Sequence, residues 1–195
     1  RWCIDDRRMG VALEVARYQG PILNRQDARE RSIGGPAQQG FHVAAVADNG
    51  GNIVYQDQTR RSLVLRGGLL VATHGLGFNL SAVKHDPGAD PIVEARPLAA
   101  WPDLITRNYQ FWLPGTDDYQ ITVRCRYTPV ARETVEIVEI AFDLMRVEET
   151  CSNGARRFTN LYWVDESSGF VWKSEQWIGP KLPRMQVEIL RPYAT

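Results

Sequence analysis

The residues with the most direct chemistry in this sequence are its cysteines, Cys3, Cys125 and Cys151. Cys125 lies in a segment where apolar and polar residues alternate, and Cys151 ends a second β-prone segment, so two neighbouring strands could bring both sulfur atoms together. A disulfide would add on the order of 3 kcal/mol to the stability in an oxidising compartment. The alternative is two buried, reduced thiols. We expect the disulfide, with Cys3 left as a free thiol.

The histidines His42, His74 and His85 are the other residues that could hold a metal ion. Their spacing fits no helical ligand pair and no Cys-x-x-Cys motif accompanies them, so the sequence predicts no metal site. His74 precedes Gly75-Leu76-Gly77, where glycines would let the backbone approach a ligand or simply make a tight turn. The turn is the simpler interpretation, and His74 is kept as a candidate ligand-binding residue.

Catalytic chemistry has little support in the sequence. It contains no Gly-x-Ser-x-Gly motif, phosphate-binding loop or zinc-protease motif. Adjacent carboxylates occur at Asp117-Asp118, Glu148-Glu149 and Asp165-Glu166. Neighbouring residues on a strand point to opposite faces, so solvated turns or edges are favoured over a glycosidase pair. We therefore predict no catalytic residue, no cofactor and no enzymatic activity.

Aromatic residues near the C-terminus form the best candidate binding surface. Their rings could stack on the faces of sugars, although aromatic side chains more commonly fill a core. The candidate ligand-binding residues are Trp163, Phe170, Trp172 and Trp177. Cationic side chains that could form the rim of a groove beside them are Arg66, Arg157 and Lys173, for which a solvated position is the simpler expectation. Arg66 is kept with the aromatic residues as a candidate.

Strands must position these residues, because short β-prone segments alternate with turn residues along the chain. Hairpins are predicted at 41–56 around Asn49-Gly50, at 62–73 around Gly67-Gly68, and at 157–178 around the turn at 166–169. Residues 119–127 alternate as a half-buried strand, which places on one side Tyr119, Ile121, Val123 and Cys125, and on the other Gln120, Thr122, Arg124 and Arg126. A last strand is predicted at 185–190.

Three segments have a less regular pattern. A short N-terminal helix is expected within 9–18, ended by Gly20-Pro21, and residues 1–20 are expected to be peripheral or mobile. Five prolines between 86 and 114 argue against a long helix or central strand, so we expect loops and edge strands there. Residues 134–149 are rich in β-branched side chains and favour a strand with a bulge, with a helix as the competing assignment.

These segments predict a mostly β fold, in which an antiparallel meander curls into an open or incomplete β-barrel within one domain, 1–195. Lys plus Arg and Asp plus Glu each total 23, so the net charge is zero and a nucleic-acid partner is disfavoured. No run approaches the roughly 18 apolar residues that a transmembrane helix needs. No signal peptide is visible, so we expect a mature or truncated chain.

Two blocks of the sequence resemble one protein family. The first is LVLRGGLLVATHGLGFNL at 63–80, and the second comprises NLYWVD at 160–165, GFVWKSEQW at 169–177 and EILRP at 188–192. In these blocks, and over about residues 21–192, the chain resembles the YjbF/GfcB family of bacterial outer-membrane lipoproteins. The resemblance implies a lipid-anchored protein on the periplasmic face of the outer membrane of a Gram-negative bacterium, associated with capsule and exopolysaccharide production.

The resemblance also implies a function without a known reaction. We expect a non-enzymatic accessory of capsule or exopolysaccharide secretion or assembly, which binds other secretion proteins or the polysaccharide itself. Cys3 is a poor lipid anchor, because a small residue normally precedes a lipidated cysteine and Trp2 stands there; any anchor is expected upstream of this chain. The alternatives are a periplasmic lipid or lipoprotein carrier with an apolar concave sheet and, last, a polysaccharide-modifying enzyme.

Overall fold

The fold consists almost entirely of β-strands. A computed structural model describes residues 12–18, 39–76, 78–112, 119–180, 182 and 184–190, with the backbone alone for 12–18 and 39–41. Its first six strands are β1 Ala12–Tyr18, β2 Gln39–Asn49, β3 Asn52–Gln56, β4 Ser62–Arg66, β5 Leu69–His74 and β6 Asn79–His85. The other six are β7 Leu104–Trp112, β8 Tyr119–Ile137, β9 Ile140–Ser152, β10 Arg157–Val164, β11 Val171–Gln176 and β12 Met185–Glu188.

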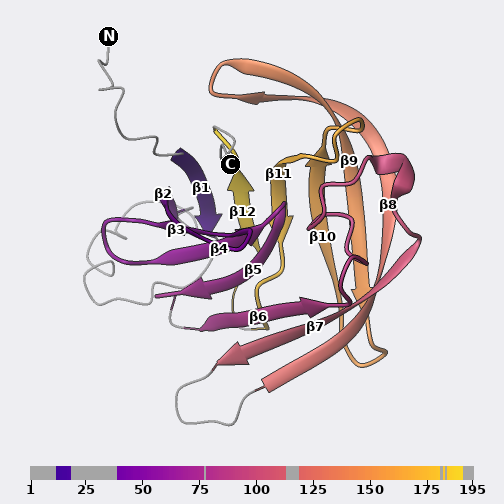
Figure 1. The fold of residues 1–195 in the computed structure, drawn as a ribbon, viewed down its shortest axis with the longest axis horizontal. Helices are drawn as coiled ribbons and strands as arrows, with labels where there is room; N and C mark the ends of the chain where they lie inside the picture. Colours follow the sequence, from indigo (N-terminus) through magenta and orange to yellow (C-terminus); the bar gives the residue numbers. More distant parts are fainter. Residues whose placement is uncertain are drawn as a thin grey trace, which may run out of the picture.

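All twelve strands form one sheet in the order β5-β4-β3-β2-β1-β12-β11-β10-β9-β8-β7-β6. Each described pair is antiparallel, and each joins consecutive strands except β1 with β12. The sheet curls until its two edge strands, β5 and β6, contact each other (Figure 1). The Leu80 amide donates to the buried Thr73 hydroxyl at 3.0 Å across this seam. The predicted incomplete barrel of meandering strands is therefore confirmed.

The core lies on the concave side of the curled sheet. Along β7 the buried residues Ile105, Tyr109 and Phe111 alternate with exposed or half-buried ones, because successive strand residues face opposite sides. Large side chains with almost no exposure fill this side, among them Tyr109, Phe111, Tyr162, Leu63, Leu70, Leu80 and Ile178. Among the described residues, no helix has the length and hydropathy that crossing a membrane requires, and the single 3-10 turn is Leu98–Ala100.

Three hairpins occur where the turn residues predicted them. β2 and β3 meet at Gly50 and Gly51, and β4 and β5 meet at Gly67 and Gly68. β10 and β11 are joined by a turn that ends at Gly169, which has a φ of 72°. Glycine adopts positive φ angles more readily than other residues, so the glycines at these turns allowed the hairpins to be predicted from the sequence.

The N-terminal segment differs from its prediction. Ala12–Tyr18 is a strand, β1, and lies inside the sheet between β2 and β12 instead of forming a helix or a peripheral segment. Strand pairing on both sides gives the backbone groups of β1 hydrogen-bond partners. This tertiary pairing decides the conformation, because the local sequence pattern favours no single secondary structure. The remaining residues of 1–20, including Cys3, lie outside the described part of the chain.

Two further segments correct the sequence interpretation. Residues 134–149 are not one bulged strand but a hairpin, because Val138 and Glu139 form a turn with φ of 50° and 64° between β8 and β9. β7 is an inner strand paired with both β6 and β8, not an edge strand. The prolines of the 86–114 region flank β7 and leave Leu104–Trp112 free of proline, so its ladder is intact.

Candidate functional site

The convex side of β7–β10 carries a band of polar residues. Arg124 on β8 is paired with Thr106 on β7 and with Ser152 on β9, and Ser152 is paired in turn with Arg157 on β10. Two residues further along β8, on the same side of the sheet, Arg126 is paired with Thr150 on β9. We call this surface the arginine face and define it as Thr106, Thr122, Arg124, Arg126, Thr150, Ser152 and Arg157, all of which are exposed or half-buried.

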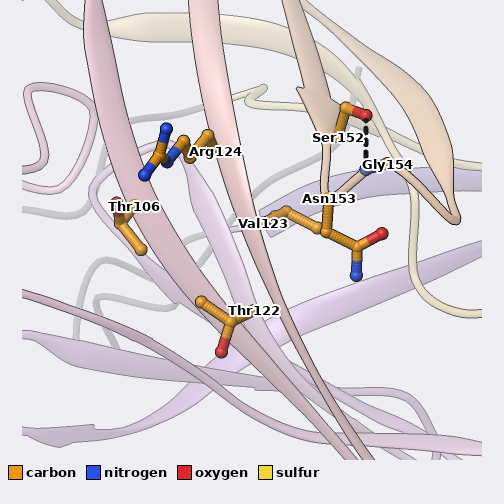
Figure 2. Close-up of a pocket in the computed structure, with 7 residues that line it drawn as sticks. All are labelled: Thr106, Thr122, Val123, Arg124, Ser152, Asn153 and Gly154. Carbon is orange, nitrogen blue, oxygen red and sulfur yellow. Dashed lines mark hydrogen bonds between the residues drawn. The ribbon is translucent and has the colours of Figure 1, made fainter.

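A groove of about 570 Å³ opens on the arginine face (Figure 2). Its lining residues come from β7, β8, the end of β9 and the β9–β10 turn: Thr106, Thr122, Val123, Arg124, Ser152, Asn153 and Gly154. The Gly154 amide donates to the Ser152 hydroxyl at 3.2 Å and the Arg156 amide donates to Asn153 Oδ1 at 2.9 Å, so the turn that closes one side of the groove is fixed. Hydroxyl, amide and guanidinium groups therefore surround this groove.

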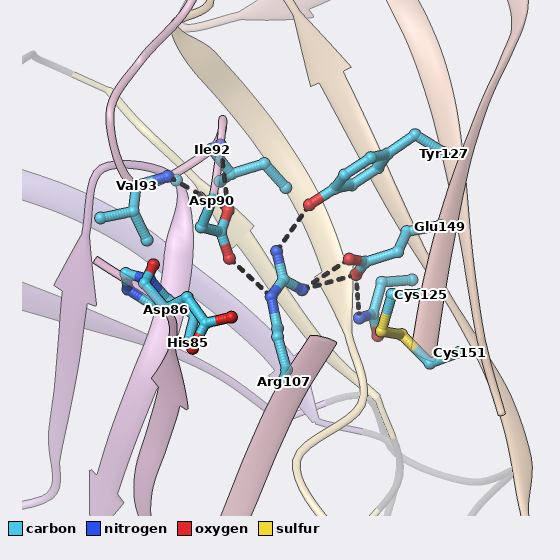
Figure 3. Close-up of polar contacts among 12 residues, drawn as sticks. His85, Asp86, Asp90, Ile92, Val93, Arg107, Cys125, Tyr127, Glu149 and Cys151 are labelled. Atoms are coloured by element: carbon cyan, nitrogen blue, oxygen red, sulfur yellow. Dashed lines mark hydrogen bonds and ion pairs between the residues drawn. A yellow bond between two sulfur atoms is a disulfide. The ribbon is translucent and has the colours of Figure 1, made fainter. Parts of the chain in front are cut away.

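A buried charged cluster on the opposite side holds the same strands together (Figure 3). The fully buried Arg107 donates from Nε to Asp90 Oδ2 at 2.7 Å and from Nη2 to the Tyr127 hydroxyl at 2.8 Å. Its Nη1 lies 2.6 Å and 2.8 Å from the two carboxylate oxygens of Glu149. Glu149 also accepts from Asn160 at 2.7 Å and from Tyr162 at 3.1 Å.

This cluster shifts the ionisation of its members. Burial opposes the charge of Arg107, but Glu149 and Asp90 outweigh it, so the pKa of Arg107 lies well above its usual value. Burial also raises the pKa of Asp90, but the Arg107 charge and hydrogen bond leave that pKa below its usual value. Burial raises the pKa of Tyr109 to about 12 and those of Tyr127 and Tyr162 well above their usual value. The cluster is enclosed, so it braces β7–β10 and presents no group to a ligand.

Comparison with known proteins identifies the family. The sequence profile of the YjbF family, described as "Group 4 capsule polysaccharide lipoprotein gfcB, YjbF", matches residues 34–190, more than half of the chain. The chain belongs to the YjbF family. This family is linked to capsule polysaccharide production and is described as a lipoprotein family, not as an enzyme family. That description indicates a location in the cell envelope.

One solved structure has the same fold as this YjbF-family chain. It is the crystal structure of the hypothetical lipoprotein YmcC from Escherichia coli (K12), with a TM-score of 0.71 over 95% of this chain and 86% of that chain. The two sequences are 20% identical, so the likeness concerns the fold. No curated protein matches the chain.

The predicted disulfide is present in this YjbF-family protein. Cys125 and Cys151 are paired directly across β8 and β9, and their sulfur atoms are bonded. The pair lies close to Glu149, but bonded sulfur atoms supply no thiolate ligands, so these residues do not form a metal site. The disulfide instead ties together the two strands that carry Arg124 and Ser152.

The four predicted aromatic residues do not form one surface. Trp177 belongs to the core, where its ring stacks on Phe158 at 4.1 Å. Trp172 stacks on Phe142 at 4.2 Å and meets the Phe170 ring edge-on at 4.9 Å. Trp163 is buried; its indole nitrogen donates to Glu133 at 2.8 Å, and Lys173 lies 5.2 Å from its ring centroid.

Arg66 and His74 lie on a different part of the sheet. Arg66 is the last residue of β4 and His74 the exposed last residue of β5, and neither strand is next to β10 or β11. Their role in binding remains a prediction. The arginine face was not predicted as a site, although the alternation of 119–127 correctly placed Arg124 and Arg126 on one side. Arg157 was named as a possible groove rim, but beside the aromatic residues and not beside Arg124, and no local pattern reveals the register that brings Thr106, Ser152 and Arg157 next to one another.

Proposed function

We propose that this protein is a non-enzymatic accessory of capsule or exopolysaccharide secretion or assembly. In this proposal it works on the periplasmic face of the outer membrane and binds a glycan or a partner protein through the arginine face. The observation that carries the proposal is the groove of hydroxyl, amide and guanidinium groups in a member of a capsule polysaccharide family. Such groups can exchange hydrogen bonds with sugar hydroxyls and with polar protein surfaces.

The packed interior of the barrel favours a protein that binds its ligand on the outer surface over a protein that carries a lipid inside. A lipid carrier needs an apolar cavity for acyl chains. Here the concave side holds packed aromatic and aliphatic side chains, and its centre holds the charges of Arg107, Asp90 and Glu149. Inserting an acyl chain would separate these charges from their partners, which is costly in a low-dielectric interior.

The chemistry of the groove supports the non-enzymatic part of the proposal. The residues that line it include no histidine, carboxylate or cysteine, which are the usual general acids, bases and nucleophiles. The buried Arg107 cluster contains carboxylates, but its side chains are enclosed and paired with one another. Hydrogen bonding to a ligand is therefore the chemistry that the groove provides.

The test is deletion of the gene in its native host, with complementation by the full-length precursor. We expect the deletion strain to lose surface polysaccharide while its intracellular precursors stay normal. Unchanged polysaccharide with altered envelope lipids or mislocalised lipoproteins would instead favour the carrier. A precursor with the groove filled by Thr106→Tyr should fail to complement, whereas Thr128→Tyr, which adds the same ring at an exposed β8 position outside the groove, should complement fully.

A further inference from the structure

The arginine face concentrates positive charge in a protein whose net charge is zero. Arg124, Arg126 and Arg157 are exposed, and the outward positions beside them carry the hydroxyl groups of Thr106, Thr150 and Ser152. None of the residues that define this face is an aspartate or glutamate. Glu148, the next outward residue of β9, accepts a hydrogen bond from Thr150 at 3.4 Å, but no ion pair within the described residues joins it to Arg124, Arg126 or Arg157.

Several cations elsewhere in the described chain are paired with carboxylates, although Arg60, Arg66, Lys84, Arg96, Arg156 and Arg184 form no ion pair within the described residues. Exposed Arg132 forms an ion pair with Glu166 at 2.7 Å, Arg146 with Glu133 at 2.7 Å, and Lys173 with Glu188 at 2.9 Å. Arg61 and the buried Arg107 are paired as well. Within the described residues, no carboxylate lies within ion-pair distance of Arg124, Arg126 or Arg157 either, and these three are grouped on one face of neighbouring strands. Three guanidinium groups on one face are thus available to a ligand.

Their spacing suits a ligand with repeated negative charges. Arg124 and Arg126 are two residues apart on one strand and so about 7 Å apart, and Arg157 lies two strands from Arg124, about 10 Å away. Guanidinium groups bind carboxylates through paired hydrogen bonds, and the serine and threonine hydroxyls between them can donate to or accept from sugar hydroxyls. A single small anion would use only part of this array.

The polar surface continues along β7 beyond the groove. Asn108 and Gln110 follow Thr106 on the same side of the strand, and Trp112, half exposed, comes at its end, about 20 Å from Thr106. Lys84 on β6 is paired with Asn108 and adds a further exposed cation. An extended chain could lie along this strand with a sugar ring stacked on the Trp112 indole.

We propose that the arginine face binds an acidic polysaccharide, a polyuronate whose carboxylates pair with Arg124, Arg126 and Arg157. This inference rests on the proposed function and names the class of glycan. Charge complementarity, the hydroxyl groups between the arginines and the length of the polar surface all support an extended acidic glycan. A nucleic acid fits less well, because the zero net charge provides no long-range attraction to a phosphate backbone.

The test measures binding of purified protein to polygalacturonate by calorimetry, with neutral dextran and single-stranded DNA as reference polymers. We expect polygalacturonate to bind, with an affinity that falls as salt is added, and dextran to bind at least tenfold more weakly. Arg124→Gln should weaken binding by about tenfold, since a charge-assisted contact is lost. Arg132→Gln, an exposed arginine of the same strand that is already paired with Glu166, should leave it unchanged.

Four results would overturn the proposal: no binding of polygalacturonate by the folded protein, equal binding of dextran, equal binding of single-stranded DNA, or unchanged binding after Arg124→Gln, Arg126→Gln and Arg157→Gln together. Thermal unfolding of each variant checks the fold, and the single variants serve if the triple variant unfolds. The proposed function is tested separately by polysaccharide secretion in the deletion strain. A secretion defect without polygalacturonate binding would retain that function and reject the polyuronate.

Discussion

Arg107 is the unusual residue of the interior, because it is a charged side chain with no exposure. A buried ion pair adds little net stability, since the charges lose their hydration, but removing one partner leaves an uncompensated charge. Arg107 contacts Asp90, Tyr127 and Glu149, which come from a loop and two strands. The cluster therefore fixes the position of the 86–103 loop against β8 and β9.

The first prediction concerns Asp90→Asn. The variant keeps the shape of the side chain but removes the charge that faces Arg107, so we expect a loss of about 3 kcal/mol in the free energy of unfolding at pH 7. Urea denaturation measures the change. Asp86→Asn, at an exposed position four residues earlier, should change stability by less than about 0.5 kcal/mol. Equal effects of both substitutions would contradict the role of the Arg107 pair.

The Asp90 carboxyl also makes the free energy of unfolding depend on pH in acid. The folded-state pKa of Asp90 is lowered, so its contribution is present above about pH 4 and is lost as the pH falls through that lowered pKa. The stability of the wild-type protein should therefore fall more steeply in acid than that of Asp90→Asn. Parallel curves for the two proteins below pH 4 would count against this account.

The buried tyrosines give a third prediction, in alkali. Their pKa values are raised in the folded protein, so the stability they contribute is complete below about pH 10 and is lost as the pH rises toward the folded-state values. We expect absorbance at 295 nm to show a late phase of tyrosinate formation that coincides with loss of structure. Tyr162→Phe should reduce the amplitude of this phase, and no late phase in the wild type would refute the prediction.

The Arg107 cluster could not be predicted from the sequence, because its members are far apart in the chain. Arg107 is separated from its partners Asp90, Tyr127 and Glu149 by 17, 20 and 42 residues, so no local spacing reports the contact. Cys125 and Cys151 are also distant in the chain, but cysteine has few alternative partners. That chemistry allowed the disulfide to be predicted when the charged cluster was not.

At the scale of single elements, some turns could also be predicted from the sequence and others could not. The hairpins at Gly50–Gly51 and Gly67–Gly68 could be predicted because glycine adopts positive φ at no steric cost. The β8–β9 turn uses Val138 and Glu139, two residue types that rarely adopt positive φ, and was missed. The β1 strand was missed because its partners, β2 and β12, include a strand from the other end of the chain.

The β10–β11 turn gives the fourth prediction. Gly169 has a φ of 72°, and a Cβ placed there would collide with the backbone carbonyl of Arg96. Gly169→Ala should therefore cost more than the roughly 1–2 kcal/mol expected for positive φ alone. Gly154→Ala is the matched control, because Gly154 has a φ of 88° and open space around its Cβ position. Chemical denaturation compares the two, and equal losses would show that the contact with Arg96 is unimportant.

Closure of the barrel belongs to the scale of the whole molecule. The edge strands β5 and β6 meet through the hydrogen bond from the Leu80 amide to Thr73 Oγ1. Thr73→Val keeps the shape but removes this acceptor, so we expect a loss of about 1–3 kcal/mol and faster hydrogen exchange at Leu80. Thr73→Ser keeps the hydroxyl and should protect the Leu80 amide better than valine does. Equal exchange in the two variants would mean that another contact closes the seam.

The pairing of β1 with β12 has a consequence for how the protein is made. Every other described strand pair joins neighbours in the chain, so most of the sheet can form by adding one strand at a time. Until β12 is in place, however, β1 and β11 each present an unpaired edge that can pair with another molecule. Aggregation during synthesis or export should therefore depend on how long β1 and β11 remain unpaired before β12 joins the sheet.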